Sequence, residues 1–83
     1  MDTGHADMRT KQYMAMCLDW SEDQWPEEAY SAREAAEQFA VTGWDNMEVG
    51  DPTTIRVVVC DAAGVRSGWT VTGDRGGAKA VPA

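Results

Sequence analysis

The alternation of apolar and polar residues predicts a first strand near the start of the chain. From Gln12 to Trp20 two interleaved sets of side chains alternate, which is the pattern of a strand with one buried face. We expect the first set to face the core: Met14, Met16, Leu18 and Trp20. We expect the second set to lie on the outer face of the sheet: Tyr13, Ala15 and Cys17.

A helix is expected from Ala32 to Thr42. Ser31 followed by Glu34 forms a capping box, in which each side chain accepts a hydrogen bond from the free N–H groups at the helix start. One stripe of the helix is apolar and mostly alanine, so the helix can lie close to a sheet: Ala32, Ala35, Ala36, Phe39 and Ala40. We expect Gly43 to end the helix in the left-handed conformation, with Trp44 packing back on Phe39.

Two further strands are expected at 54–60 and 65–72, where β-branched residues concentrate. Gly64 suits the left-handed position of a three-residue hairpin loop between them. That loop sets the register at Asp61 with Val65, Val59 with Ser67, Val57 with Trp69, and Ile55 with Val71. The register places Trp69 on the same face as the valines, whereas a slip by one residue would separate them.

These elements predict an α+β fold of the order β-α-β-β, a three-stranded, mainly antiparallel sheet with one helix packed on one face. We expect a disordered N-terminal segment at 1–11, one domain at 12–74 and a flexible C-terminal tail at 75–83. Residues 21–28, which include Trp25-Pro26, are expected to be an acidic connector.

The beginning of the sequence has no apolar stretch behind a basic start, and no run approaches membrane-spanning length, so we expect a cytoplasmic protein. Cys17 and Cys60 lie far apart without a CxxC spacing, which favours free thiols in a reducing compartment over a disulfide.

Catalytic and metal chemistry find little support in the sequence. The one histidine, His5, lies in the expected N-terminal segment. The acidic loop that starts at Asp45 fails as a calcium loop, because Met47, Val49 and Arg56 occupy ligand positions. We therefore expect no enzyme, no metal and no cofactor. The basic residues are too few and too scattered for direct binding to nucleic acid.

The distribution of charge along the chain is more informative than the total charge. The formal net charge is −7, but the stretch from Asp19 to Asp51 holds ten acids and a single base, Arg33. Such a surface attracts proteins that bind DNA, since its carboxylates can take the places of phosphates in a basic groove. The alternative is a face that is merely solvated. The candidate partner-binding residues are Asp19, Glu22, Asp23, Trp25, Glu27, Glu28, Glu34, Glu37, Asp45, Glu48 and Asp51.

Trp25 is included because an exposed indole beside acids can anchor an interface. It can equally fold back over the helix end.

In size, acidity, expected flexible ends and a lone helix on a short antiparallel sheet, the stretch from Gln12 to Asp74 resembles the small inhibitors made by bacteriophages, especially the anti-CRISPR proteins. The resemblance covers overall character and rests on no shared motif, so it transfers no residue. It implies a non-catalytic inhibitor of a bacterial protein complex such as a CRISPR effector, some members of that group acting as DNA mimics.

A homodimeric regulatory or accessory subunit is the alternative function. The expected outer sheet face is less polar than an exposed face should be, and two such faces can pair. Its residues are Tyr13, Ala15, Cys17, Val58, Cys60 and Thr70.

Overall fold

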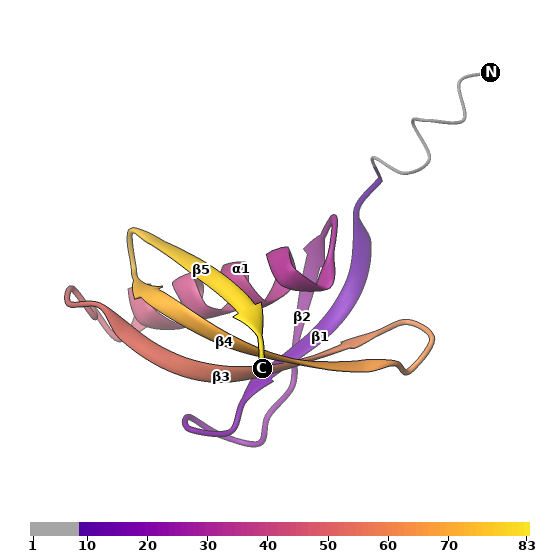
Figure 1. Ribbon diagram of the computed structural model, residues 1–83, viewed down its shortest axis with the longest axis horizontal. Helices are drawn as coiled ribbons and strands as arrows, with labels where there is room; N and C mark the ends of the chain where they lie inside the picture. Colours follow the sequence, from indigo (N-terminus) through magenta and orange to yellow (C-terminus); the bar gives the residue numbers. More distant parts are fainter. Residues whose placement is uncertain (1–8) are drawn as a thin grey trace.

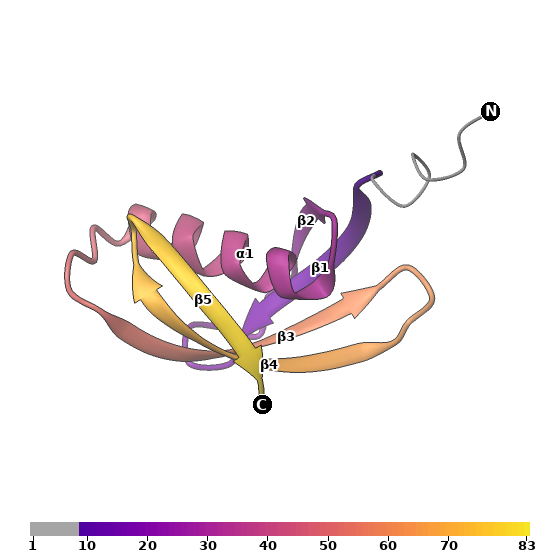
Figure 2. The ribbon, with the colours of Figure 1, turned by 45° about the horizontal axis from the view of Figure 1, so that its top comes forward.

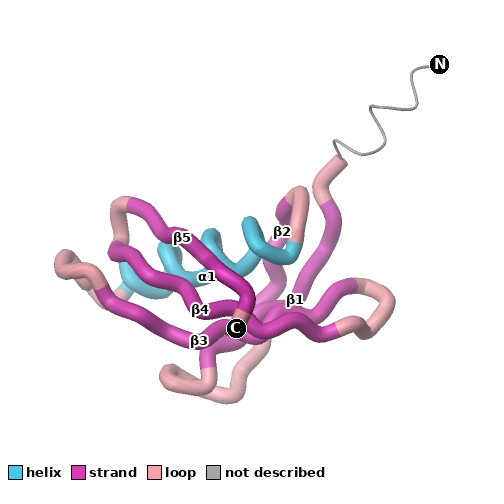
Figure 3. The backbone as a smooth tube through the Cα atoms, viewed as in Figure 1, coloured by secondary structure: helices cyan, strands magenta, loops and turns pink. Residues whose placement is uncertain are grey.

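The computed structural model describes residues 9–83, which form one helix and a five-stranded sheet (Figures 1 and 3). The elements are β1 (Lys11–Cys17), β2 (Trp25–Ala29), α1 (Ala32–Asn46), β3 (Thr53–Asp61), β4 (Arg66–Asp74) and β5 (Gly77–Pro82). The sheet order is β2-β1-β3-β4-β5, and every neighbouring pair is antiparallel. The α+β class and the single helix agree with the sequence prediction, but the expected number of three strands is wrong.

The two additional strands lie at the two edges of the sheet. β2 occupies the expected acidic connector, and it tolerates Pro26 because an edge strand does not need every N–H for pairing. β5 occupies the expected flexible tail, so the domain extends beyond 74 to Pro82. A tight turn joins it to β4, in which the Gly76 N–H donates to Asp74 Oδ1 (2.8 Å). The prediction of disorder at 1–11 falls mostly on residues outside the described range, but Lys11 already belongs to β1.

The sheet curves around the helix, which lies on its concave side (Figure 2). Both edge strands contact the helix. The N–H of Ala80 in β5 donates to Glu37 Oε2 on the helix (2.8 Å). The buried core between sheet and helix is made largely of small side chains and valines: Ala15, Cys17, Ala29, Ala35, Ala36, Ala40, Val57, Val59, Val71 and Ala80, with the larger Tyr13, Phe39, Trp44 and Ile55.

The expected faces of the first strand are reversed. Ala15 pairs with Val59 and Cys17 with Val57, so these small residues share the buried face under the helix. Met14 is 37% exposed on the opposite face, which we call the outer face. Both sets of side chains are apolar. The alanine-rich helix can come close to the sheet only over the set that contains the small side chains of Ala15 and Cys17. Of the residues assigned to the outer face, only Val58, Cys60 and Thr70 are there.

The hairpin between β3 and β4 was predicted correctly. Gly64 has φ 86° and the Asp61 N–H donates to the Val65 carbonyl (3.0 Å). The expected pairs from Ile55–Val71 to Val59–Ser67 are all present. Asp61 adds a feature that was not foreseen, because its Oδ1 accepts from the N–H groups of Ala63 and Val65 (2.9 Å each).

The helix begins as predicted and ends later. The Glu34 N–H donates to Ser31 Oγ and the Tyr30 N–H donates to Glu34 Oε1, each at 3.1 Å, so the capping box is formed. At the other end the helix continues through Gly43 to Asn46, and the left-handed residue is Glu48, with φ 56°.

Gly43 does not end the helix; it makes room for a packing contact. An added Cβ at this position would lie 2.2 Å from Cζ3 of Trp20. The indole of Trp20 therefore rests directly on the helix backbone, which only glycine allows. Trp20 also contacts Phe39 (5.6 Å between ring centroids) and meets Trp44 edge-on (6.4 Å).

Gly43→Ala is expected to destabilise the protein by roughly 1–3 kcal/mol, because Trp20 must move to admit the methyl group. Helix propensity alone predicts the opposite sign, a gain of up to about 1 kcal/mol. Urea unfolding measures the difference. Gly50→Ala is the control, since nothing lies within 4 Å of its added Cβ. Equal stabilities of the two variants would contradict the packing role.

Candidate functional site

Five of the predicted acids gather on the helix side of the sheet, and we call this surface the acidic face: Asp23, Glu27, Glu34, Glu37 and Asp45. Glu27, Glu34 and Glu37 line one shallow depression together with Gln38, Val41 and Thr42. Asp45 continues the solvent-facing helix stripe through Glu34, Gln38 and Val41, which recur at helical spacing. Asp23 joins the group through a neighbouring cleft that it shares with Glu27.

No basic side chain of residues 9–83 forms an ion pair with the acidic face. Within residues 9–83 the only ion pair joins Arg56 to Asp19 (3.7 Å), and neither residue belongs to the acidic face. Arg33, the one base in the acidic stretch, lies over the Trp69 ring, 5.7 Å from its centroid. The carboxylates of the acidic face therefore produce a negative potential into solvent.

Two members of the acidic face also hold the fold together. Glu34 accepts from the Tyr30 N–H in the capping box and from Nε2 of Gln38 (3.2 Å). Glu37 accepts from the Ala80 N–H of β5. Their positions are fixed by these hydrogen bonds, whereas the side chains of Asp23, Glu27 and Asp45 accept none from the described residues. Only the latter three can be changed without a direct cost to the fold.

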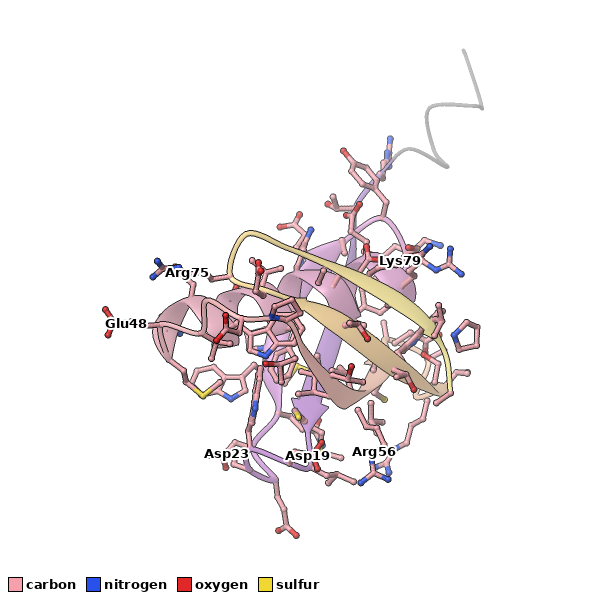
Figure 4. The ribbon with its side chains drawn as sticks, turned by 60° about the vertical axis from the view of Figure 1, so that its left-hand side comes forward. Asp19, Asp23, Glu48, Arg56, Arg75 and Lys79 are labelled. Carbon is pink, nitrogen blue, oxygen red and sulfur yellow. The ribbon has the colours of Figure 1, made fainter. Side chains whose placement is uncertain are left out.

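The other predicted acids lie elsewhere. Asp19 pairs with Arg56 and also accepts from its backbone N–H (3.5 Å), an arrangement visible in Figure 4. Glu28 accepts from the Thr10 hydroxyl and belongs to the outer face, and Glu22 is exposed in the connector between β1 and β2. Glu48 and Asp51 are exposed beyond the helix end, and Figure 4 shows Glu48 well away from Asp23.

Beside the acidic face is a cleft of about 360 Å³, which we call the aromatic cleft. It lies between the β1–β2 connector and the C-terminal half of α1. Its walls are Cys17, Trp20, Ser21, Asp23, Trp25, Pro26, Glu27, Phe39, Thr42, Gly43, Asn46 and Met47. Trp25 is 56% exposed although it lies on the helix side of β2. Trp25 therefore combines the two alternatives: its indole lines the cleft beside the C-terminal half of the helix and stays exposed to solvent.

The sequence pattern predicts Trp20 and Phe39 in the core, where they do pack, but it does not indicate that both also line a cleft. The available signal was the pair of tryptophans that flanks the acidic connector, Trp20 before it and Trp25 at its end.

Burial perturbs two titratable groups that line the cleft. Desolvation raises the pKa of the Glu27 carboxyl above its ordinary value of 4.5. Desolvation also raises the pKa of the Cys17 thiol, with the charge of Asp19 adding to the effect and backbone hydrogen bonds opposing it. Cys17 is therefore a neutral thiol at physiological pH and a poor nucleophile. Both Cys17 and Cys60 are free, in agreement with the prediction.

Metal sites and membrane-spanning helices are both missing from the described part of the chain. No group of three or more His, Cys, Asp or Glu side chains in residues 9–83 is arranged to hold a metal ion. In the same range, no helix is long and apolar enough to cross a membrane.

Glu27→Gln is expected to stabilise the fold slightly at neutral pH, by less than about 1 kcal/mol because the side chain keeps contact with water. Since the folded-state pKa is raised, the ionised carboxyl opposes folding at neutral pH. The gain should disappear below pH 4.5, where the wild-type carboxyl is protonated in both states. The midpoints of urea unfolding of wild type and variant, measured at neutral pH and below pH 4.5, test this expectation. Glu22→Gln, an exposed acid in the connector between β1 and β2, controls for the loss of a charge; a gain of equal size in that variant would contradict the desolvation.

The sequence and the fold were compared with protein-family models, with curated proteins and with solved structures, and none of the three comparisons gave a match. The functional assignment therefore rests on the acidic face and the aromatic cleft, which share Asp23 and Glu27.

Proposed function

We propose that this chain is a non-catalytic, protein-binding inhibitor whose acidic face occupies a basic, nucleic-acid-binding site on its target. The observation that carries the proposal is the gathering of five carboxylates from the connector, β2 and α1 on one side of the sheet, with no Lys or Arg of residues 9–83 paired to them. A protein groove that has evolved to receive phosphates presents the complementary charge.

Rigidity supports this function. Glu34 and Glu37 are fixed by hydrogen bonds to backbone N–H groups, and α1 is held against the curved sheet along its length. Fixed charges lose little conformational entropy on binding, so a larger part of the electrostatic attraction contributes to affinity. Direct binding to nucleic acid is disfavoured on this side because its charge has the same sign as the phosphates.

The resemblance to small phage inhibitors suggests the class of target. Under this proposal the partner is a nucleic-acid-binding bacterial complex, such as a CRISPR effector, and the protein acts in the host cytoplasm. The inhibitor needs no metal, cofactor or catalytic group, since occupying the groove is sufficient to exclude the nucleic acid.

Replacing Gln38 and Asp45 by lysine is expected to weaken target binding at least about 10-fold, because it puts positive charge beside Glu34 and reverses one of the five acids. The Gln38→Lys change is not expected to harm the helix, since a lysine four residues after Glu34 forms a favourable pair. The original Glu34 and Glu37 remain in place to hold the fold. Affinity capture from a bacterial lysate at low and high salt, followed by a binding measurement on the captured protein, tests the expectation.

The matched control is Gln12→Lys combined with Asp51→Lys, which changes the net charge by the same amount away from the acidic face. Wild type and control should retain the target at low salt and release it at high salt. Nucleic acid should compete for the captured protein. Unchanged affinity of the Gln38→Lys, Asp45→Lys variant would rule out the acidic face as the binding surface.

A homodimeric accessory subunit is the second candidate function, and the outer face is the observation that favours it. No element of residues 9–83 covers this face of the sheet. Met14, Met16, Val58 and Cys60 cluster there around a small hollow, with Arg66 and Gln24 beside them. Val81 on β5 is 44% exposed. Pairing of two such faces would remove this apolar surface from water.

Val58→Asp places a charge at the centre of this cluster and is expected to convert a dimer into a monomer, as measured by light scattering across a range of concentrations. Val58 is only half-buried, so the folded monomer should survive, which circular dichroism can verify. A wild-type protein that is monomeric at all concentrations would exclude the dimer.

A further inference from the structure

We propose that the aromatic cleft is the anchor of the interface and receives one arginine side chain of the protein partner. This inference rests on the proposed function and deepens it, since it identifies a single pocket and the group that fills it. The walls, the charges and the size of the cleft each favour this occupant.

The walls are aromatic and fixed. Trp20 is held between the backbone of Gly43 and the rings of Phe39 and Trp44, so it cannot collapse into the cleft without leaving the core. Trp25 is more than half exposed at the mouth of the same cleft. An exposed indole beside a rigid aromatic wall is the arrangement in which interface residues contribute most to affinity.

The charges at the rim select a cation. Asp23 and Glu27 both line the cleft, and neither has a basic partner within the described residues. Glu27 is partly removed from water, so its attraction to an incoming cation is screened less than that of a fully exposed acid. A purely apolar side chain would desolvate these two carboxylates without any compensation.

A planar guanidinium fits this combination better than an ammonium does. It can stack on an indole while it donates to carboxylates at its edge. The molecule already contains one such contact, in which Arg33 lies over Trp69. The cleft volume of about 360 Å³ is at the lower end of the range for small-molecule pockets, which suits one long side chain.

The experiment uses arginine amide as the probe and follows the indole N–H signals of the full-length protein by NMR. The signals of Trp20 and Trp25 should shift and saturate, with a Kd on the order of 1 mM for a ligand of this size. The signal of Trp69, which lies outside the cleft, serves as the internal reference. Citrulline amide has the same shape and the same α-ammonium group but a neutral ureido group in place of the guanidinium, and it should bind at least about 10-fold more weakly.

Two variants test separately the contribution of the aromatic wall and that of the acidic rim to arginine amide binding. Trp25→Leu and Glu27→Gln should each weaken arginine amide at least about 10-fold. Glu48→Gln removes an acid that lies outside the cleft and should leave the affinity unchanged. Preserved indole signals of Trp44 and Trp69 show that each variant is folded. Equal binding of arginine amide and citrulline amide, or the absence of any saturable shift at Trp20 and Trp25, would overturn the proposal.

Failure of this inference and failure of the proposed function give different results. Absence of arginine amide binding, together with loss of target capture by the Gln38→Lys, Asp45→Lys variant, overturns the arginine pocket alone. Arginine amide binding at Trp20 and Trp25, together with unchanged capture by that variant, supports the pocket and overturns the acidic face.

Discussion

The close approach of the helix to the sheet is the constraint on which the rest of the structure depends. Alanines line the inner stripe of α1, and Ala15, Cys17 and Ala80 meet them from the sheet. Small side chains on both surfaces bring the two backbones together, so the sheet must curve for its edges to reach the helix (Figure 2). The large rings of Phe39 and Trp44 are buried toward the C-terminal half of the helix. Trp20 packs on both of them there, where Gly43 leaves room for its indole.

The position of Trp20 connects the core to the candidate site. Trp20 completes the core with one face and lines the aromatic cleft with the remainder, so the cleft wall has the rigidity of the interior. The acidic face likewise serves both the fold and the candidate site. Glu34 and Glu37 stabilise the start of α1 and the edge of β5, and they carry part of the negative charge. Mutual repulsion among these carboxylates is tolerated because backbone N–H groups neutralise part of it locally.

The parts of the fold that local rules determine could be predicted from the sequence. The capping box at Ser31 and the hairpin at Gly64 depend on neighbouring residues, and both are present. The faces of β1 could not be assigned, since both sets of its side chains are apolar and the choice depends on the distant helix. β2 and β5 were missed because proline and alanine are poor strand formers, and their pairing depends on contacts across the sheet.

For the candidate site, composition located the acids, but only the three-dimensional structure separates Glu27 and Asp45 from Asp19, which Arg56 neutralises. The same holds for the role of Gly43. Its position before Trp44 is typical of a helix stop, and nothing in the local sequence indicates that the indole of Trp20, far away along the chain, rests on it.

The two edges of the sheet have a consequence for how this molecule meets others. Free N–H and C=O groups along an edge invite another chain to add a strand, which leads to uncontrolled aggregation. On β2 the edge bears Pro26, Glu27 and Glu28, and on β5 the carboxylate of Glu37 already occupies the Ala80 N–H. These features oppose the addition of another strand at both edges, so association through side-chain surfaces is favoured.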